Sequence, residues 1–258
     1  KCWSVEWPDG CKDANDVLQN LGTEALSLAI DQAAAMPLEG VYSADDYALE
    51  IAHLYDKGLV GGLSTGIASV DKLFTVVPGQ LSVVTGLPGS GKSEFIDQIM
   101  VNLAESEGWK FAVASFENPP PLHVAKLSEK YVGKPFFEGM PDRMSRVESV
   151  AAMKWVSDHF LFLEQRGGEA ATIDSILDRA RQAVMRLGIR GLVIDPYNYI
   201  SQSRSADNEH QGINEMLTRL VAFARSNQIH IWFIAHPAKM ATNPDGTTAV
   251  PKGMNISG

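Results

Sequence analysis

The chain has 258 residues, of which 45% are hydrophobic, 21% charged and 8% aromatic, as is usual for soluble globular proteins. This composition excludes a disordered or collagen-like chain. The 22 basic and 31 acidic residues give a net charge of −9, which argues against nucleic-acid binding through overall charge but not against a local basic channel.

The two cysteines, Cys2 and Cys11, are too few for a disulfide framework or a four-ligand zinc site, and we interpret them as ordinary thiols of an intracellular protein. No apolar run approaches the roughly 18 residues of a membrane span, and the N-terminus lacks a signal pattern. Because the chain begins at Lys1 and stops at Gly258 without the features of a natural end, we expect it to be a fragment of a longer protein.

The first third of the chain predicts a remnant and a linker before the main domain. Residues 1–22 are too few to build a core and predict the end of a preceding domain. Apolar spacing predicts a helix from Thr23 to Ala35, and Ser43 precedes a second amphipathic helix that ends before Gly58. Gly61 and Gly62 mark the boundary, so we expect a helical linker at 23–62 and a core domain at 63–258.

Beyond Gly62, short apolar runs alternate with helical patterns, which is typical of an α/β fold with a mostly parallel sheet and helices on both faces. The predicted strands are Leu81–Thr85, Phe111–Phe116, Phe160–Leu163, Leu192–Ile194 and Ile229–Ala235, and the predicted helices lie near 92–106, 172–187 and 209–226.

A glycine-rich segment between the first of these strands and its helix matches the G-x-x-x-x-G-K-[ST] pattern of a P-loop. Glycines allow backbone N–H groups to turn toward an anion, and the helix N-terminus adds its positive dipole end. Lys92 would reach the β and γ phosphates, and the Ser93 hydroxyl would ligate Mg²⁺. A chance glycine turn is the alternative, but the strand before it and the helix after it favour nucleotide binding. The predicted nucleotide-binding residues are Gly86, Pro88, Gly89, Ser90, Gly91, Lys92, Ser93 and Glu94.

Polar residues follow three other strands, at the edge of a parallel sheet where ligands bind. Asp195 ends a strand as the second Mg²⁺ ligand would, although it could instead cap the turn before Pro196. Glu117 could polarise an attacking water, with a solvated strand-end residue as the alternative and Glu164 as the rival candidate. His236 could sense the γ-phosphate, or could be an ordinary buried histidine.

These residues resemble the DnaB-type hexameric replicative helicases, which have a RecA-like P-loop core, and within them the group of the T-odd phage primase-helicases and mitochondrial Twinkle helicases. The run Cys11-Lys12-Asp13-Ala14-Asn15-Asp16 resembles the end of the family's TOPRIM primase module. Ser64-Thr65-Gly66-Ile67 with Asp71 resembles the start of the helicase core. His236-Pro237-Ala238-Lys239 resembles the motif that senses the γ-phosphate.

The resemblance implies an ATP- or other NTP-dependent helicase that forms a hexameric or heptameric ring and translocates 5′ to 3′ on single-stranded DNA. In that reading Glu117, Lys92 and His236 are catalytic, and Ser93 and Asp195 hold Mg²⁺. The helix at Asp45–Tyr55 would dock on a neighbouring subunit, with an ordinary surface helix as the alternative. The expected compartment is a bacterial or phage-infected cytoplasm or an organellar matrix.

The DNA-contacting residues are predicted in two polar segments, Ser201–His210 and Lys239–Gly253, where Lys239 and Lys252 are the candidates and an ordinary solvated loop is the alternative. The family's arginine finger would lie beyond Gly258, so we expect weak hydrolysis by the fragment alone. The rival functions are a RadA/RecA-type recombination ATPase and a weakly hydrolysing nucleotide-binding assembly module.

Overall fold

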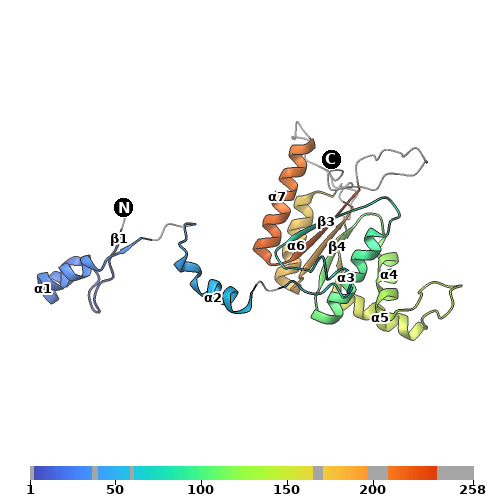
Figure 1. The fold of residues 1–258 in the computed structure, drawn as a ribbon, viewed down its shortest axis with the longest axis horizontal. Helices are drawn as coiled ribbons and strands as arrows, with labels where there is room; N and C mark the ends of the chain where they lie inside the picture. Colours follow the sequence, from blue (N-terminus) through green and yellow to red (C-terminus); the bar gives the residue numbers. More distant parts are fainter. Residues whose placement is uncertain (1–2, 37–39, 59–60, 165–170, 197–208, 237–258) are drawn as a thin grey trace. The chain divides into compact units, whose positions relative to one another are not determined.

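The structure is a computed structural model that describes residues 3–36, 40–58, 61–164, 171–196 and 209–236. The chain divides into two compact units, residues 1–60 and 61–258 (Figure 1). The elements of the first unit are β1 (Trp3–Ser4), α1 (Ala14–Asp31), β2 (Ala34–Ala35), the 3₁₀ turn η1 (Asp45–Tyr47) and α2 (Ala48–Lys57). Those of the second are β3 (Leu81–Thr85), α3 (Lys92–Glu107), β4 (Phe111–Ser115), α4 (Pro120–Val132), α5 (Arg146–His159), β5 (Phe160–Phe162), α6 (Ile173–Leu187), β6 (Gly191–Asp195), α7 (Glu209–Asn227) and β7 (His230–Ala235).

In the first unit, α1 begins well before the predicted helix start at Thr23. Asp13 caps the helix by accepting a hydrogen bond from the Asp16 backbone N–H at 2.9 Å, so the polar run that was interpreted as a domain end initiates a helix. Gly22 leaves the helical conformation with φ 86°, so α1 consists of two helical segments joined by a kink. The second segment begins at Thr23, where the helix was predicted to start. The predicted C-terminal end at Ala35 was wrong, because the helix ends at Asp31 and Ala34–Ala35 form β2, which pairs antiparallel with β1.

The second predicted helix is present as η1 followed by α2, and it ends before Gly58 as expected. Ser43 does not accept a capping bond. Its backbone N–H and its hydroxyl instead both donate to Asp46 Oδ2, at 2.6 and 2.9 Å. Several large apolar side chains of α2 are exposed, among them Leu49 at 88% and Tyr55 at 90%.

The second unit contains a parallel sheet of five described strands in the order β3-β7-β6-β4-β5. All five predicted strands are present, and no strand end differs from the prediction by more than one residue. The central strands β4, β6 and β7 are buried almost throughout, as expected of near-continuous apolar runs in a parallel sheet.

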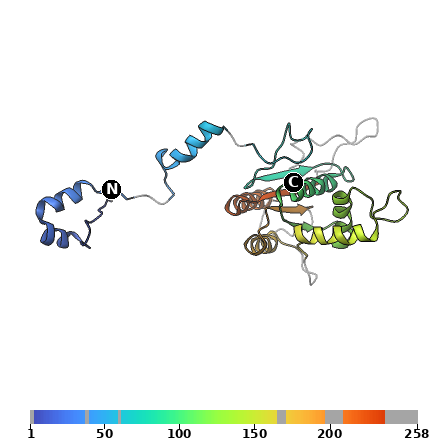
Figure 2. The ribbon, with the colours of Figure 1, turned by 90° about the horizontal axis from the view of Figure 1, so that it is seen from below.

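The strand order explains why helices cover both faces (Figure 2). The connections from β3 to β4 and from β4 to β5 run in one direction across the sheet, whereas those from β5 to β6 and from β6 to β7 run back. Because such crossovers are right-handed, the two directions place their helices on opposite faces. Accordingly, α3, α4 and α5 pack into one apolar cluster, and α6 and α7 into another.

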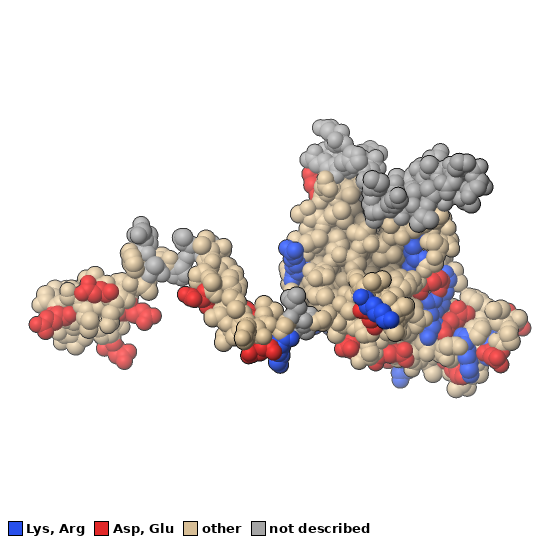
Figure 3. Space-filling view, in the orientation of Figure 1, with Lys and Arg blue, Asp and Glu red and all other residues tan. Residues whose placement is uncertain are grey.

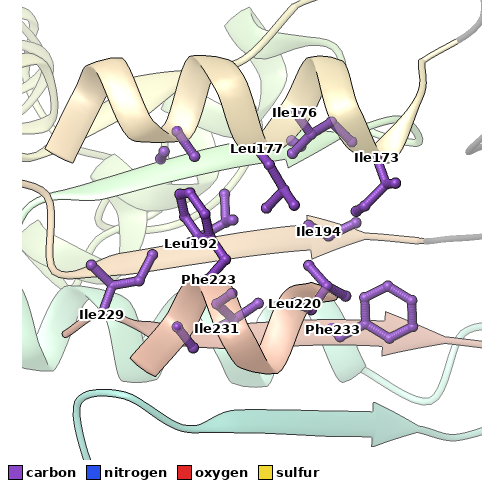
Figure 4. Packing of buried hydrophobic residues seen from close by; sticks show 14 of the residues in the cluster. Ile173, Ile176, Leu177, Leu192, Ile194, Leu220, Phe223, Ile229, Ile231 and Phe233 are labelled. Carbon is purple, nitrogen blue, oxygen red and sulfur yellow. The ribbon is translucent and has the colours of Figure 1, made fainter. Parts of the chain in front are cut away.

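Alternate residues of the central strands supply the two clusters, as the two-residue period of a strand requires. Figure 4 shows the α6 and α7 side, where Leu192 and Ile194 of β6 and Ile231 and Phe233 of β7 meet apolar side chains of the helices. The buried apolar residues of α6 recur with the helical period and so form one face of the helix. A capping box of Thr172 and Ser175 begins the helix. This packing fixes β6, and with it Asp195 at the end of the strand.

Helices α3, α6 and α7 lie where they were predicted, but α4 and α5 were missed. Three prolines follow Asn118, and no helix was predicted there. They occupy the N-cap, Pro119, and the first turn of α4, positions at which proline needs no N–H donor. Within the described ranges, every helix is too short or too polar to cross a lipid bilayer.

Candidate nucleotide-binding site

Residues Gly86 to Gly91 form the turn between β3 and α3, and Lys92 and Ser93 begin α3, as the P-loop pattern predicted. Gly89 and Gly91 have φ values of 73° and 87°, which glycine adopts without strain. A Cβ atom on Gly86 would lie 2.8 Å from Ser90 Oγ, so a side chain there would require the Ser90 hydroxyl to move. Gly91 is the N-cap of α3 and no side chain caps it, which leaves the first-turn N–H groups available to an anion.

The Lys92 ammonium closes over this turn. Its Nζ donates hydrogen bonds to the backbone oxygens of Gly86 at 2.9 Å and Leu87 at 3.1 Å. The lysine therefore holds the loop in shape, and its positive charge lies beside the same glycine turn that offers N–H groups. Both features suit a phosphate chain.

Asp195 and Ser93 meet at the adjacent strand end. Asp195 is 3% exposed at the end of β6. Burial raises the pKa of Asp195, as do the charges of Asp97 and Glu117, whereas a hydrogen bond with Ser93 and the proximity of His123 oppose the rise. A bound cation would offset the unfavourable burial of this carboxylate.

The donor set fits Mg²⁺, which is usually held by one or two protein oxygens together with phosphates and waters. Ser93 and Asp195 provide a hydroxyl and a carboxylate of this kind. In the part of the chain that the structure describes, no three His, Cys, Asp or Glu side chains gather as a separate metal site.

Glu117 and His236 lie in contact beside this pair. His236 Nε2 is 3.1 Å from Glu117 Oε1, and their side chains are 26% and 41% exposed. Glu117 follows β4 and His236 follows β7, the two strands that flank β6 in the sheet. The structure thus brings together Ser93, Asp195, Glu117 and His236. Glu164 follows the outer strand β5, where its backbone oxygen accepts a bond from Arg179 at 2.8 Å, and this placement favours Glu117.

The Glu94 carboxylate points away from the phosphate cradle, toward α4. It forms ion pairs with Lys126, at 3.0 Å, and with Lys130. Partial burial by itself would raise the pKa of Glu94, but the hydrogen bonds from Lys130 and Lys126 outweigh it and lower the pKa. The predicted contact of Glu94 with nucleotide is therefore left to its backbone N–H group.

A buried pair beneath the site was missed in the sequence. Asp97 on α3 and His123 on α4 are 2% and 1% exposed, and Asp97 Oδ1 lies 2.9 Å from His123 Nε2. The helical spacing of Ser93 and Asp97, which places them on one face of α3, could have indicated the acid. No signal indicated His123, because α4 itself was not predicted.

The segment that resembles the start of a helicase core has a structural role. Asp71 accepts hydrogen bonds from the Ser64 hydroxyl at 2.5 Å and from the Thr65 N–H at 2.7 Å. The Ser64 bond is the main cause of the lowered pKa of Asp71. Asn102 of α3 in turn donates to the Thr65 backbone oxygen at 2.8 Å, so this turn is fastened to the helix that follows the P-loop.

Of the predicted DNA segments, residues 201–208 and Lys239–Gly253, with Lys239 and Lys252, lie outside the described residues, whereas Glu209 and His210 begin α7. On the face shown in Figure 3, the described Lys and Arg side chains of the second unit are interspersed with Asp and Glu and do not form a continuous basic patch. This distribution is consistent with the net charge of −9.

The chain is similar to known proteins over most of its length. The family described as an AAA domain matches residues 57–242. The whole chain is 42% identical to "Twinkle homolog protein, chloroplastic/mitochondrial" of Arabidopsis thaliana, of which it spans 38%. Over 70% of its length it is 26% identical to "Probable plasmid replicative DNA helicase" of Chlamydia psittaci, of which it spans 42%. The chain thus spans well under half the length of either relative.

Two solved structures share the fold. The ATPase domain of G40P superposes with a TM-score of 0.64 at 14% identity, over 84% of this chain and 78% of that one. A DnaB-like replicative helicase, solved in a study of its interactions with primase, gives a TM-score of 0.60 at 13% identity, over 87% and 54%. The chain belongs to the AAA domain family, with a RecA-like core of the DnaB type and a sequence related to Twinkle.

Proposed function

We propose that this chain is the motor core of a replicative DNA helicase, which hydrolyses ATP or another NTP with Mg²⁺. Nucleotide binding follows from its family. The observation that carries the proposal is the contact of Glu117 with His236 beside the buried Asp195 and the P-loop. The names of the two relatives, a Twinkle homolog and a probable plasmid replicative DNA helicase, favour a helicase over a recombination ATPase.

Each residue has a distinct task in this mechanism. The loop N–H groups and Lys92 bind the phosphates, and Ser93 and Asp195 would hold Mg²⁺. When bound, that ion supplies Lewis-acid stabilisation of charge on the phosphates. Glu117 orients and polarises the attacking water as a general base. His236 touches Glu117, so a change at the γ-phosphate can pass through this contact to the segment that follows His236.

Two substitutions in the full-length enzyme test these roles. Lys92→Ala should abolish nucleotide binding or turnover, because the loop loses its only side-chain cation among the described P-loop residues. Glu117→Gln should leave nucleotide bound but unhydrolysed, measured as retained binding of a fluorescent nucleotide with loss of phosphate release. Hydrolysis retained by Glu117→Gln would place the base elsewhere.

The larger assembly is part of the proposal. We infer a hexameric or heptameric ring that moves 5′ to 3′ on single-stranded DNA, through Lys239 and Lys252, and that works with other replication proteins. Residues 1–22 would end a TOPRIM module, and 23–62 would link it to the core. The exposed apolar side chains of α2 support its docking on a neighbouring subunit. The proposed compartment is an organellar matrix or the cytoplasm of a bacterial or phage-infected cell.

Imaging and DNA-stimulated hydrolysis separate this proposal from its rivals. With Mg²⁺ and a nonhydrolysable nucleotide, the full-length protein should form closed rings, whereas filaments would indicate a RadA/RecA-type ATPase. Single-stranded DNA should accelerate hydrolysis. Negligible hydrolysis with and without DNA would indicate an assembly module.

A further inference from the structure

Lys126 of α4 contacts a residue next to the P-loop and a residue next to Glu117. Its Nζ atom is 3.0 Å from Glu94 Oε1 and 3.2 Å from Asn118 Oδ1. Glu94 directly follows Ser93 of the P-loop, and Asn118 directly follows Glu117. One ammonium group therefore joins the residue next to the magnesium-binding hydroxyl to the residue next to the proposed general base.

The sheet does not make this connection directly. Strand β3, which leads into the P-loop, and strand β4, which leads to Glu117, are separated by β7 and β6. After β4 the chain leaves the sheet, and the Asn118 backbone N–H is held by the Ser115 hydroxyl at 3.3 Å. The Lys126 bond to the Asn118 side chain ties this turn to α4, and the Lys126–Glu94 ion pair continues the link to α3.

Lys126 is well suited to fix the distance between Glu94 and Asn118. Its side chain is 27% exposed, so it keeps part of its hydration while its charge strengthens both hydrogen bonds. Lys130, one turn later on α4, binds the same Glu94 carboxylate, and the structure gives it no bond to Asn118. The two lysines therefore differ in one relevant contact.

We propose that Lys126 is a positioning residue that sets Glu117 at its working distance from the P-loop; this inference rests on the proposed hydrolytic function. Lys126 touches neither phosphate-binding nor magnesium-binding side chains. Helices α3 and α4 are also joined by the buried Asp97–His123 pair and by the packing of Leu127. Loss of Lys126 should thus release the Glu117 turn while the helices stay docked.

The test compares Lys126→Met with Lys130→Met in the full-length enzyme. Lys126→Met should lower kcat by about 10- to 100-fold, as expected for a displaced catalytic group, with little change in KM for nucleotide. Lys130→Met should keep a near wild-type kcat, and Lys126→Arg should recover much of the loss because the guanidinium can reach both acceptors.

Asn118→Leu should lower kcat similarly, and combining it with Lys126→Met should add little. Equal kcat values for the two Met variants would overturn the inference while leaving the proposed function intact.

A second measurement does not depend on turnover. Amide hydrogen exchange at residues 116–118 should speed up in Lys126→Met and remain at the wild-type rate in Lys130→Met, with α3 protected in both. Unchanged exchange at 116–118 in Lys126→Met would overturn the inference even if the enzyme proved not to hydrolyse nucleotide.

Discussion

The two faces of the sheet are built differently. The face covered by α6 and α7 is a cluster of apolar side chains, among them Leu192, Leu220 and Phe223. The opposite face has an apolar cluster of similar kind, but α3 and α4 also carry the Asp97–His123 pair and the Glu94 ion pairs there. The P-loop helix α3 packs on this second face. The comparison indicates that one face chiefly stabilises the sheet, whereas the other also holds the site in alignment.

The largest expected effect is at the end of β6, between the two faces. Asp195→Asn should reduce Mg²⁺-dependent hydrolysis by about 100-fold or more, because a neutral amide is a poor ligand. Without nucleotide, the same variant should melt at a higher temperature. Burial raises the pKa of Asp195 in the folded protein above its usual value of 3.8. Stability therefore falls as the pH rises from 3.8 through the raised pKa, because the buried carboxyl group ionises. Asparagine avoids this cost.

Calorimetry and phosphate release measure the two effects. The matched control is Glu117→Gln, which should also lose hydrolysis but gain less stability, because its side chain is 41% exposed. A lower melting temperature for nucleotide-free Asp195→Asn would contradict the claim that the ionised, buried Asp195 carboxylate destabilises the fold.

The α6 and α7 face should respond to mutation in stability alone. Leu220→Ala removes a fully buried side chain of α7 and should lower the free energy of unfolding by about 2 to 5 kcal/mol. Denaturant unfolding measures the loss. Below the transition, kcat per folded enzyme should stay near wild type, and a large fall in kcat would show that this face also aligns the site.

The α3 and α4 face should show coupling between its buried polar groups. His123→Leu leaves Asp97 buried without its hydrogen-bond partner, and should lower the free energy of unfolding by about 2 to 3 kcal/mol. Adding Asp97→Leu should recover part of this loss, since both polar groups are then replaced. Additive losses in a double-mutant cycle would mean that the pair is not coupled.

The smallest expected effect distinguishes the helix caps of the two faces. The capping box of α5 uses Ser145 and Glu148, whereas that of α6 uses the uncharged Thr172 and Ser175. The hydrogen bond from Lys134, helped by Ser145, lowers the pKa of Glu148 from 4.5 to about 2. The ionised Glu148 carboxylate therefore contributes fully to stability above pH 4.5, and this contribution is lost as the pH falls toward 2.

Amide exchange at the first turns of α5 and α6 should show this difference. As the pH falls from 4.5 toward 2, the first turn of α5 should lose its protection from exchange before the first turn of α6 does. Glu148→Gln, which cannot titrate, should remove the pH dependence at α5, and equal loss at both helices would contradict the assignment.

The parts of the structure predicted from sequence are those with local signals. The apolar runs predicted the strands, and the glycine pattern predicted the turn that carries Lys92 and Ser93. Helix α4 was missed because Pro119 and its neighbours carry the same signal in a loop and in a first helical turn. His123 and Lys126 were lost with it, and the Asp97–His123 and Lys126–Asn118 contacts depend on a packing that no local pattern encodes.

The position of β6 and β7 between β3 and β4 has a consequence for synthesis and folding. The P-loop is made early, but the strands that separate it from Glu117 and that deliver Asp195 and His236 come last in the described sheet. Pairings such as Leu81 with Ile231 join distant parts of the chain, and contacts of this kind form slowly. A nascent chain that has not yet added β7 therefore has the phosphate-binding turn without its neighbours, and competence to turn over nucleotide arrives only with the final strands.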